Sequence, residues 1–489
     1  TRRDVKIFVC QISVDTKKPF VFDKSEPGRI VVKCTSKACS FKMIFHGFGN
    51  GPFHFAQERP HTCQLFVATI KRCWVRKQVQ EMKGANKAIK PAAMQEKLKA
   101  DYKVDVDKAL IKNALFDVKR SPSFDNRAFG LVSSFLDVLT RNNEGSTTSV
   151  LSLDGIFQRA FLCPGVCSRA FEHTPKIVGL DACHIKAWYG GVVLVMTALD
   201  GNGGIFPVAL GIAESEKTET WFWFLCLVKG ALRIEGDGEG IVFLSDREKG
   251  IETSVQAVFP RAAHGFCVWH MQKNVKVHHH TNLKGLLFKA AHAGTEEEFN
   301  DTMAQMRAVH PAAAAYVKEI EAVKWSRAFF PMRRFGHVTS NIAESANKWL
   351  EEARYQDPVG LFSTYIRQIN VKFEKRRTKY TSSPEATLPK RVFALLSQSV
   401  KDSRTLDVRR HTRTLFEVQR KSDRGSFRVV DLQERTCTCS FYKEYGVPCQ
   451  HVCAAVLSTN EEPAQFVVPE RRPEALLETY VVVVRPVDM

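Results

Sequence analysis

The chain has 489 residues, 44% hydrophobic and 25% charged, which is the composition of a globular protein with several domains rather than a disordered or fibrous one. Lysine and arginine total 71 against 52 acidic residues, giving a formal net charge of +19. This excess predicts a polyanionic partner, most often nucleic acid, although a basic surface can also serve solubility alone. No apolar run reaches the ~18 residues of a membrane span, so we expect no membrane partner.

The chain contains 14 cysteines, several of them within a few residues of another cysteine or a histidine. This spacing favours metal binding over a disulfide framework. Residues 1–68 alternate apolar runs such as DVKIFVCQISV and GRIVVKC with turn residues, which predicts a small β module. Within it, Cys34 and Cys39 precede His61 and Cys63, a spacing that can close a tetrahedral zinc site. Unrelated buried thiols beside a surface histidine are the alternative.

Residues 69–140 have a helical pattern. Pro91 suits the first turn of a helix, and Val104 and Val106 suit a tight hydrophobic connection. The region resembles a helix-turn-helix unit for DNA binding or dimerisation, but a helical linker that serves only packing fits equally well. As a DNA-binding unit, it would contact the groove through Lys108, Lys112, Asn113, Lys119 and Arg120.

Residues 150–283 contain three apolar runs, KIVGLDACHIKA, GGVVLVMTALD and GIFPVALGIAES, then an aromatic helix and a strand, VFLS, that ends at Asp246. A carboxylate at the end of a buried strand costs free energy unless it is exposed, paired or bound to metal. Asp181 lies within the first run. If the two strands are neighbours, both carboxylates lie on adjacent backbones and can hold a divalent metal. Asp181 as a strand-end turn former is the alternative.

A helix predicted at 340–353 supplies a third carboxylate, Glu344, on the side opposite its apolar stripe, where it faces either water or a polar cleft. Three carboxylates suit Mg²⁺ or Mn²⁺, which prefer oxygen ligands. Two such ions about 3.5–4 Å apart can activate a hydroxyl and stabilise the leaving oxygen in phosphodiester cleavage. The helix lies within 331–380, after a mostly helical segment at 284–330 that we interpret as an insertion.

The run CTCSFYKEYGVPCQH in residues 405–460 supplies four closely spaced ligands with no acid among them, as structural zinc requires: Cys437, Cys439, Cys449 and His451. The last segment, 461–489, is interrupted by prolines, and we expect it to pack as an appendage.

Four motifs resemble, in order, the Mutator-like (MULE) transposase domain over about 175–355: VGLDACHIKAWYGG, LSDREKG, FCVWHMQKN and TSNIAESANKWLEEAR. The resemblance implies an α/β protein with a ribonuclease-H-like core, a mixed sheet with flanking helices, and an all-α insertion. An Asp-Asp-Glu triad falls on Asp181, Asp246 and Glu344. Cys267 and His270 take the positions of a Cys-x-x-His motif, with a structural role beside the active site. The second cysteine run resembles a SWIM zinc finger, and the first module resembles the WRKY-like fingers of such transposases.

The resemblance implies a cut-and-paste DNA transposase with two Mg²⁺ or Mn²⁺ ions in the active site and two structural Zn²⁺ ions. Its partners would be double-stranded DNA, as terminal inverted repeats and target, and a second or further copy of the chain. We expect it to act in the nucleus. Further DNA contacts are predicted at Arg247, Lys249, Arg333 and Arg334. Two alternatives are a transposase-derived transcriptional regulator without the chemistry and a structure-specific nuclease that never joins strands.

Overall fold

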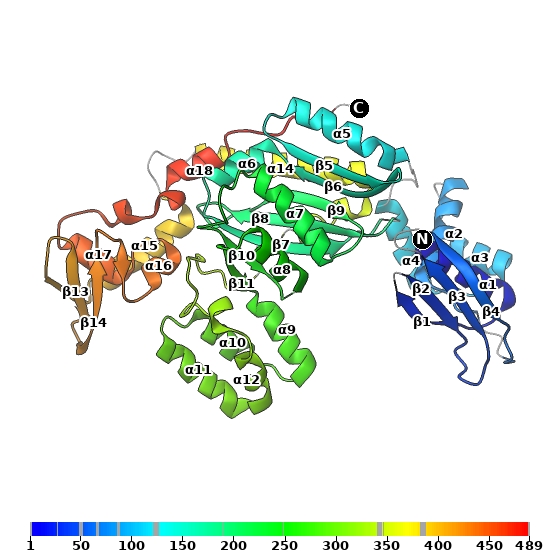
Figure 1. Ribbon diagram of the computed structural model, residues 1–489, viewed down its shortest axis with the longest axis horizontal. Helices are drawn as coiled ribbons and strands as arrows, with labels where there is room; N and C mark the ends of the chain where they lie inside the picture. Colours follow the sequence, from blue (N-terminus) through cyan, green and yellow to red (C-terminus); the bar gives the residue numbers. More distant parts are fainter. Residues whose placement is uncertain are drawn as a thin grey trace. The chain divides into compact units, whose positions relative to one another are not determined.

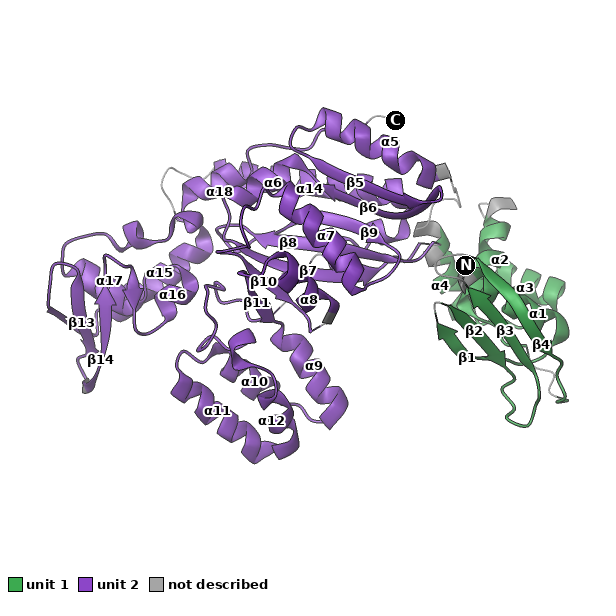
Figure 2. Ribbon diagram, viewed as in Figure 1, with its two compact units in different colours: residues 1–124 green, residues 125–489 purple. Residues whose placement is uncertain are grey.

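A computed structural model shows two compact units, residues 1–124 and 125–489, each with its own hydrophobic core (Figure 2). Along the described residues, no helix combines the length and the apolar character needed to cross a membrane. The structure describes residues 2–26, 28–47, 52–64, 68–85, 89–120, 127–187, 189–247, 249–339, 345, 347–381 and 388–487.

Unit 1 packs an antiparallel sheet, in the order β1-β2-β3-β4, against helices (Figure 1). Phe45 of the sheet shares one buried core with Trp74 and Leu98 of the helices, so the β module and the helical region fold together. The elements are α1 (Arg2–Thr16), β1 (Val21–Glu26), β2 (Arg29–Lys33), β3 (Lys42–Gly47), β4 (Phe53–Arg59), α2 (Arg72–Ala85), α3 (Pro91–Tyr102) and α4 (Lys108–Arg120).

The first segment, interpreted from the sequence as a strand, is helix α1. Val5, Val9 and Val14 are buried and recur at intervals of four and five residues, which is the period of a helix and not of a strand. The valines and isoleucines of the run favour a strand by propensity, and packing overrides that preference. The prediction of strand here is wrong, whereas β2 and β3 lie where the sequence predicts them.

The predicted helical connection in unit 1 is confirmed. Pro91 stands in the first turn of α3, and the helix ends at Lys103, which has a left-handed backbone conformation. Val104 and Val106 are buried between α3 and α4. On α4, Ile111, Ala114 and Leu115 face the core.

Unit 2 is built on a seven-stranded mixed sheet in the order β11-β10-β7-β8-β9-β6-β5. Strands β7, β10 and β11 run parallel, and the other neighbours are antiparallel. Figure 1 shows α7 in front of this sheet and α14 behind it. The elements up to the last strand are α5 (Arg127–Asn142), β5 (Thr147–Leu153), β6 (Ile156–Cys163), α6 (Gly165–Glu172), β7 (Ile177–His184), β8 (Val192–Leu199), β9 (Ile205–Ala213), α7 (Thr218–Ala231), β10 (Val242–Ser245), α8 (Lys249–Val258) and β11 (Ala263–Phe266).

The sequence predicts four strands of this sheet, β7 to β10, and does not predict β5, β6 and β11. Strand β5 is polar and partly exposed, and its sequence is therefore typical of a linker. The signal for the β5–β6 hairpin is Asp154-Gly155, where both residues have positive φ as a tight turn requires. Strand β11 has only four residues.

A helical subdomain follows the sheet, as the sequence predicts for 284–330. Its core joins Phe299 and Trp325 with Met271 of α9, so α9 belongs to the subdomain as well. The elements are α9 (Val268–His279), α10 (Lys284–His292), α11 (Glu296–Val309), α12 (Pro311–Lys318) and η1 (Ala322–Lys324).

The remaining chain returns to the main sheet and then forms a second small sheet, in the order β12-β13-β14-β15. Residues 345 and 347–349 are helical, and the predicted helix at 340–353 therefore ends near Trp349. The elements are η2 (Ala353–Tyr355), α14 (Pro358–Thr381), α15 (Lys390–Ser403), β12 (Leu406–Arg410), β13 (Leu415–Arg420), β14 (Asp423–Asp431), β15 (Thr436–Cys437), α16 (Phe441–Tyr445), α17 (Gln450–Leu457), η3 (Pro463–Phe466), η4 (Pro469–Arg471) and α18 (Pro473–Thr479).

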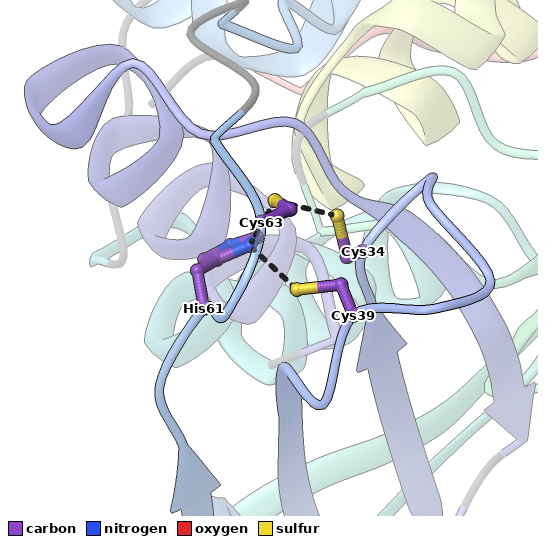
Figure 3. Close-up of side chains that lie close together, drawn as sticks. All are labelled: Cys34, Cys39, His61 and Cys63. Carbon is purple, nitrogen blue, oxygen red and sulfur yellow. Dashed lines mark hydrogen bonds between the residues drawn. The ribbon is translucent and has the colours of Figure 1, made fainter.

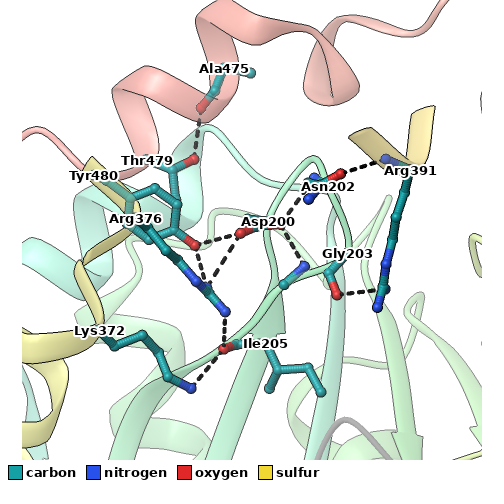
Figure 4. Close-up of polar contacts among 11 residues, drawn as sticks. Asp200, Asn202, Gly203, Ile205, Lys372, Arg376, Arg391, Ala475, Thr479 and Tyr480 are labelled. Carbon is teal, nitrogen blue, oxygen red and sulfur yellow. Dashed lines mark hydrogen bonds and ion pairs between the residues drawn. The ribbon is translucent and has the colours of Figure 1, made fainter. Parts of the chain in front are cut away.

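The carboxyl-terminal segment is part of the main core and not an appendage. Tyr480 is 1% exposed, and its hydroxyl donates a hydrogen bond of 2.7 Å to Asp200 at the end of β8 (Figure 4). The same hydroxyl accepts a hydrogen bond of 2.5 Å from Arg376 on α14. Asp200 is 1% exposed and forms an ion pair of 3.3 Å with Arg376, so the buried carboxylate is fully partnered.

Replacing Tyr480 by Phe removes the hydroxyl that serves both buried charges. We expect the free energy of unfolding, measured by urea denaturation, to fall by about 1–3 kcal/mol, because Asp200 and Arg376 each lose a partner without regaining water. Tyr445→Phe is the matched control, since the Tyr445 hydroxyl has no hydrogen-bond partner among the residues that the structure describes. An equal change in both variants would contradict a stabilising role for the Tyr480 hydroxyl.

Candidate active site and metal centres

Two carboxylates stand at the same level on neighbouring strands of the main sheet. Strand β10 pairs with β7 in parallel, with Leu244 opposite Gly179, so Asp246 and Asp181, each two residues further on, continue the same register. The neighbouring strands that the sequence argument requires are therefore present. Both side chains are half-buried. Adjacent carboxylates of this kind repel each other unless a cation lies between them or nearby.

Asn347 contacts one carboxylate of this pair. The Asn347 amide nitrogen donates a hydrogen bond of 2.7 Å to Asp181 Oδ2, while Asp181 Oδ1 accepts the Ala182 amide at 2.9 Å. Glu344, the third predicted carboxylate, lies outside the described residues. The sequence analysis did not single out Asn347, although in the helix predicted at 340–353 a residue three positions after Glu344 is expected on the same side.

The oxygen atoms at this point fit a divalent metal. Asn347 Oδ1 is buried and has no hydrogen-bond partner among the described residues. A buried acceptor without a donor is costly, and a cation relieves that cost. Carboxylate and amide oxygens are ligands that Mg²⁺ and Mn²⁺ accept. The side-chain types of Asp181, Asp246 and Asn347 are thus compatible with such an ion.

Cys267 and His270 lie close to Asp246. The buried Cys267 precedes the first residue of α9, and its amide donates a hydrogen bond of 2.8 Å to the Ser245 carbonyl. Its thiol forms a hydrogen bond with His270, and this bond raises the pKa of His270. Partial burial of His270 acts in the opposite direction, and the charge of Asp246 raises the pKa further. On the other side, Ser245 Oγ lies 2.8 Å from His264 Nε2. Burial lowers the pKa of His264 to about 3, so this imidazole is neutral.

The amino-terminal Cys/His cluster is assembled as predicted. The candidate ligand atoms of Cys34, Cys39, His61 and Cys63 all lie within 4.8 Å of one another (Figure 3). The Cys34 and Cys63 sulfurs are 3.6 Å apart, and His61 Nδ1 lies 3.5 Å from the sulfurs of Cys39 and Cys63. Tetrahedral zinc with bonds of about 2.3 Å to sulfur and 2.0–2.1 Å to nitrogen places its ligands about 3.5–3.8 Å apart. The four atoms therefore fit one zinc ion.

A second Cys/His cluster has the same geometry. The ligand atoms of Cys437, Cys439, Cys449 and His451 also lie within 4.8 Å of one another, and His451 Nδ1 is 3.8 Å from the sulfurs of Cys437 and Cys449. The first two cysteines flank the turn after β15, and the last two ligands open α17. These two clusters support structural zinc. The described residues hold no further group of three or more His, Cys, Asp or Glu ligands.

The residues predicted to contact DNA differ in their exposure to solvent. Lys108, Lys112 and Asn113 are exposed along α4. Lys119 and Arg120 belong to α4 and Lys249 to α8, but their side chains lie outside what the structure describes.

Of the remaining arginines, Arg334 cannot contact DNA. Its guanidinium is fully buried, lies 4.5 Å from the ring centroid of Phe330 and donates to the Trp325 carbonyl, so that prediction is wrong. Arg333 donates to the Lys443 carbonyl at 2.8 Å and thus links the main core to α16. Arg247 donates to the Tyr316 hydroxyl at 3.0 Å. Only the fold shows that these arginines serve internal contacts.

Comparison with protein families places two known domains on this geometry. Residues 177–274, from β7 into α9, match the family model of the MULE transposase domain. Residues 427–460, which hold the second Cys/His cluster, match that of the SWIM zinc finger. No match to a curated protein was found. The chain therefore carries a transposase domain followed by a SWIM zinc finger, while a WRKY-like identity for the amino-terminal cluster stays a prediction.

Proposed function

We propose that the protein is a cut-and-paste DNA transposase that cleaves DNA at element ends and joins the freed 3′-hydroxyls to target DNA. The observation that carries the proposal is the pairing of Asp181 and Asp246 on adjacent strands inside the segment that matches a transposase domain. The net charge of +19 supports a nucleic-acid substrate.

The proposal includes a ribonuclease-H-like core. Three antiparallel strands, β7 to β9, are followed by β10 and β11, which add in parallel on the other side of β7, and this is the order expected of such a sheet. The helical subdomain enters before the segment of Glu344, as the family resemblance implies.

Each residue of the site has a proposed task. Asp181 and Asp246, with Glu344, would hold Mg²⁺ or Mn²⁺, which as a pair supply Lewis acidity to the attacking and leaving oxygens. Asn347 orients Asp181 through the hydrogen bond to Oδ2. Cys267 and His270 fix the turn after β10 on which Asp246 stands. The two zinc clusters fold their modules, and the exposed residues of α4 would contact the terminal repeats as double-stranded DNA.

Action in the nucleus and assembly as a dimer or larger complex on paired ends belong to the same proposal. The test is incubation of the purified protein with DNA carrying element ends and Mg²⁺. We expect strand cleavage followed by strand-transfer products. Cleavage without any joined product would favour a nuclease, and binding without cleavage under both Mg²⁺ and Mn²⁺ would contradict the proposal.

A further inference from the structure

A basic cavity of about 520 Å³ lies between α14, the β8–β9 turn and the start of α15 in unit 2. Six of its lining residues are cationic, and no lining residue among those described is acidic. They are Arg367, Lys372, Lys375, Arg376, Lys379 and Arg391. A cavity with this excess of one charge favours an anionic ligand.

The exposed cations of the cavity are spaced along the length of α14. Lys375 and Lys379 are four residues apart and share one side of α14, and Arg367, which also forms an ion pair of 2.9 Å with Glu352, lines the same cavity. The 12 helical steps from Arg367 to Lys379 correspond to about 18 Å. One strand of a DNA duplex presents a phosphate about every 3.4 Å along its axis, and an unpaired strand is more extended, so this length would hold at most about five phosphates. The row matches an extended polyanion better than a single small phosphate.

The floor of the cavity holds two further cations in fixed positions. Lys372 Nζ and Arg376 Nη2 each donate a hydrogen bond of 3.0 Å to the Ile205 carbonyl (Figure 4). The nearby carboxylate of Asp200 is already shared by Arg376, Tyr480 and the turn amides of Asn202 and Gly204. Burial and then the neighbouring Arg376 lower the pKa of Lys372 to about 8. An anion above these side chains would offset the repulsion between them.

Two aromatic residues, Trp349 and Tyr380, line the same cavity. Lys372 Nζ lies 5.2 Å from the Trp349 ring centroid and Lys379 Nζ 5.4 Å from that of Tyr380. Cations interleaved with aromatic rings are typical of sites for unpaired nucleic-acid strands, whose bases stack on the rings. Trp349 lies two residues after Asn347 in the chain and packs against Tyr365 of α14 with ring centroids 5.8 Å apart.

We propose that this cavity binds an unpaired DNA strand, with phosphates on the α14 cations and bases against Trp349 and Tyr380. The proposal rests on the proposed function in that it takes DNA as the substrate, and it adds a binding site for a separated strand along α14.

The test measures DNA binding by fluorescence anisotropy on the full chain carrying Asp246→Asn, which prevents cleavage during the measurement. Lys375→Gln/Lys379→Gln should raise the Kd for single-stranded DNA by about tenfold to a hundredfold at low salt and reduce the slope of log K against log salt by about 1.4, or 0.7 per contact. The control, Arg377→Gln/Lys401→Gln, removes the same charge from α14 and α15 outside this cavity. It should change both quantities much less.

A second variant tests stacking separately from charge. Tyr380→Leu should weaken single-strand binding by about tenfold and leave the salt slope unchanged. Thermal melting checks that each variant is folded. If the Lys375/Lys379 variant binds single strands as the control does, or weakens duplex binding alone, the proposal is overturned.

These outcomes are separable from the proposed chemistry. Loss of single-strand binding in a protein that never cleaves DNA would keep the cavity assignment and reject the nuclease activity. If the protein cleaves DNA and its α14 variants still bind single strands normally, the nuclease activity is kept and the cavity assignment is rejected.

Discussion

Asp246→Asn should abolish Mg²⁺-dependent cleavage of element-end DNA while leaving DNA binding intact. The amide has the shape of the carboxylate but no charge, so it holds a divalent ion poorly beside Asp181. Metal-ion stabilisation of the transition state is worth several kcal/mol, and we therefore expect the cleavage rate to fall by about 10³-fold. Gel assays of cleavage, with binding measured in parallel by anisotropy, give the two quantities.

Asp301→Asn is the matched control, because Asp301 is exposed on α11 and loses the same charge. It should cleave at the wild-type rate. Asp181→Asn should reproduce the loss, and it also changes the acceptor of the Asn347 hydrogen bond. Cleavage that persists in Asp246→Asn would place the chemistry elsewhere in the chain.

Cys449→Ser should reduce the zinc content of the purified protein from two ions per chain to about one and unfold the SWIM finger. Structural zinc contributes about 10–16 kcal/mol to the folding of small fingers. The module has a limited core of its own, centred on Phe416, Val418 and Val452, so it depends on the metal. Elemental analysis measures the zinc, and proteolysis of residues 405–460 measures the unfolding.

Cys453→Ala is the control that distinguishes loss of a zinc ligand from loss of any buried cysteine on the same helix. Cys453 is buried on the same helix, α17, but is outside the cluster, so this variant should retain two zinc ions. Cys34→Ser should remove the other zinc and leave the SWIM finger resistant to protease. Two zinc ions in Cys449→Ser would contradict the assignment of Cys449 as a ligand.

Local sequence patterns predicted the elements that a single period or spacing defines. Strands β7 to β10, helix α7 and both Cys/His clusters follow from apolar runs and short ligand spacings. Elements whose sequence resembles another class were missed or assigned wrongly: α1, whose valines favour a strand, and β5, whose polar residues resemble a linker. Tertiary packing determines the secondary structure of such segments, and a short stretch of sequence carries no information about that packing.

The candidate site was only partly accessible from the sequence for the same reason. Asp181 and Asp246 could be singled out because each interrupts or ends an apolar run, but their common level depends on the register of β7 against β10. The buried state of Arg334 depends on Phe330 and on the Trp325 carbonyl. The cation row on α14 is visible in the sequence, whereas its cavity forms only beside the β8–β9 turn.

The pairing of Asp200 with Tyr480 joins positions 280 residues apart, and this separation has a consequence for biosynthesis. At 5–20 residues per second, Asp200 is translated on the order of 14–56 s before Tyr480. Throughout that interval the nascent polypeptide contains a carboxylate destined for the interior whose tyrosine partner does not yet exist. The buried Asp200 carboxylate can pair earlier with Arg376 and with the turn amides of Asn202 and Gly204, and it gains its complete set of partners only once residue 480 has been made.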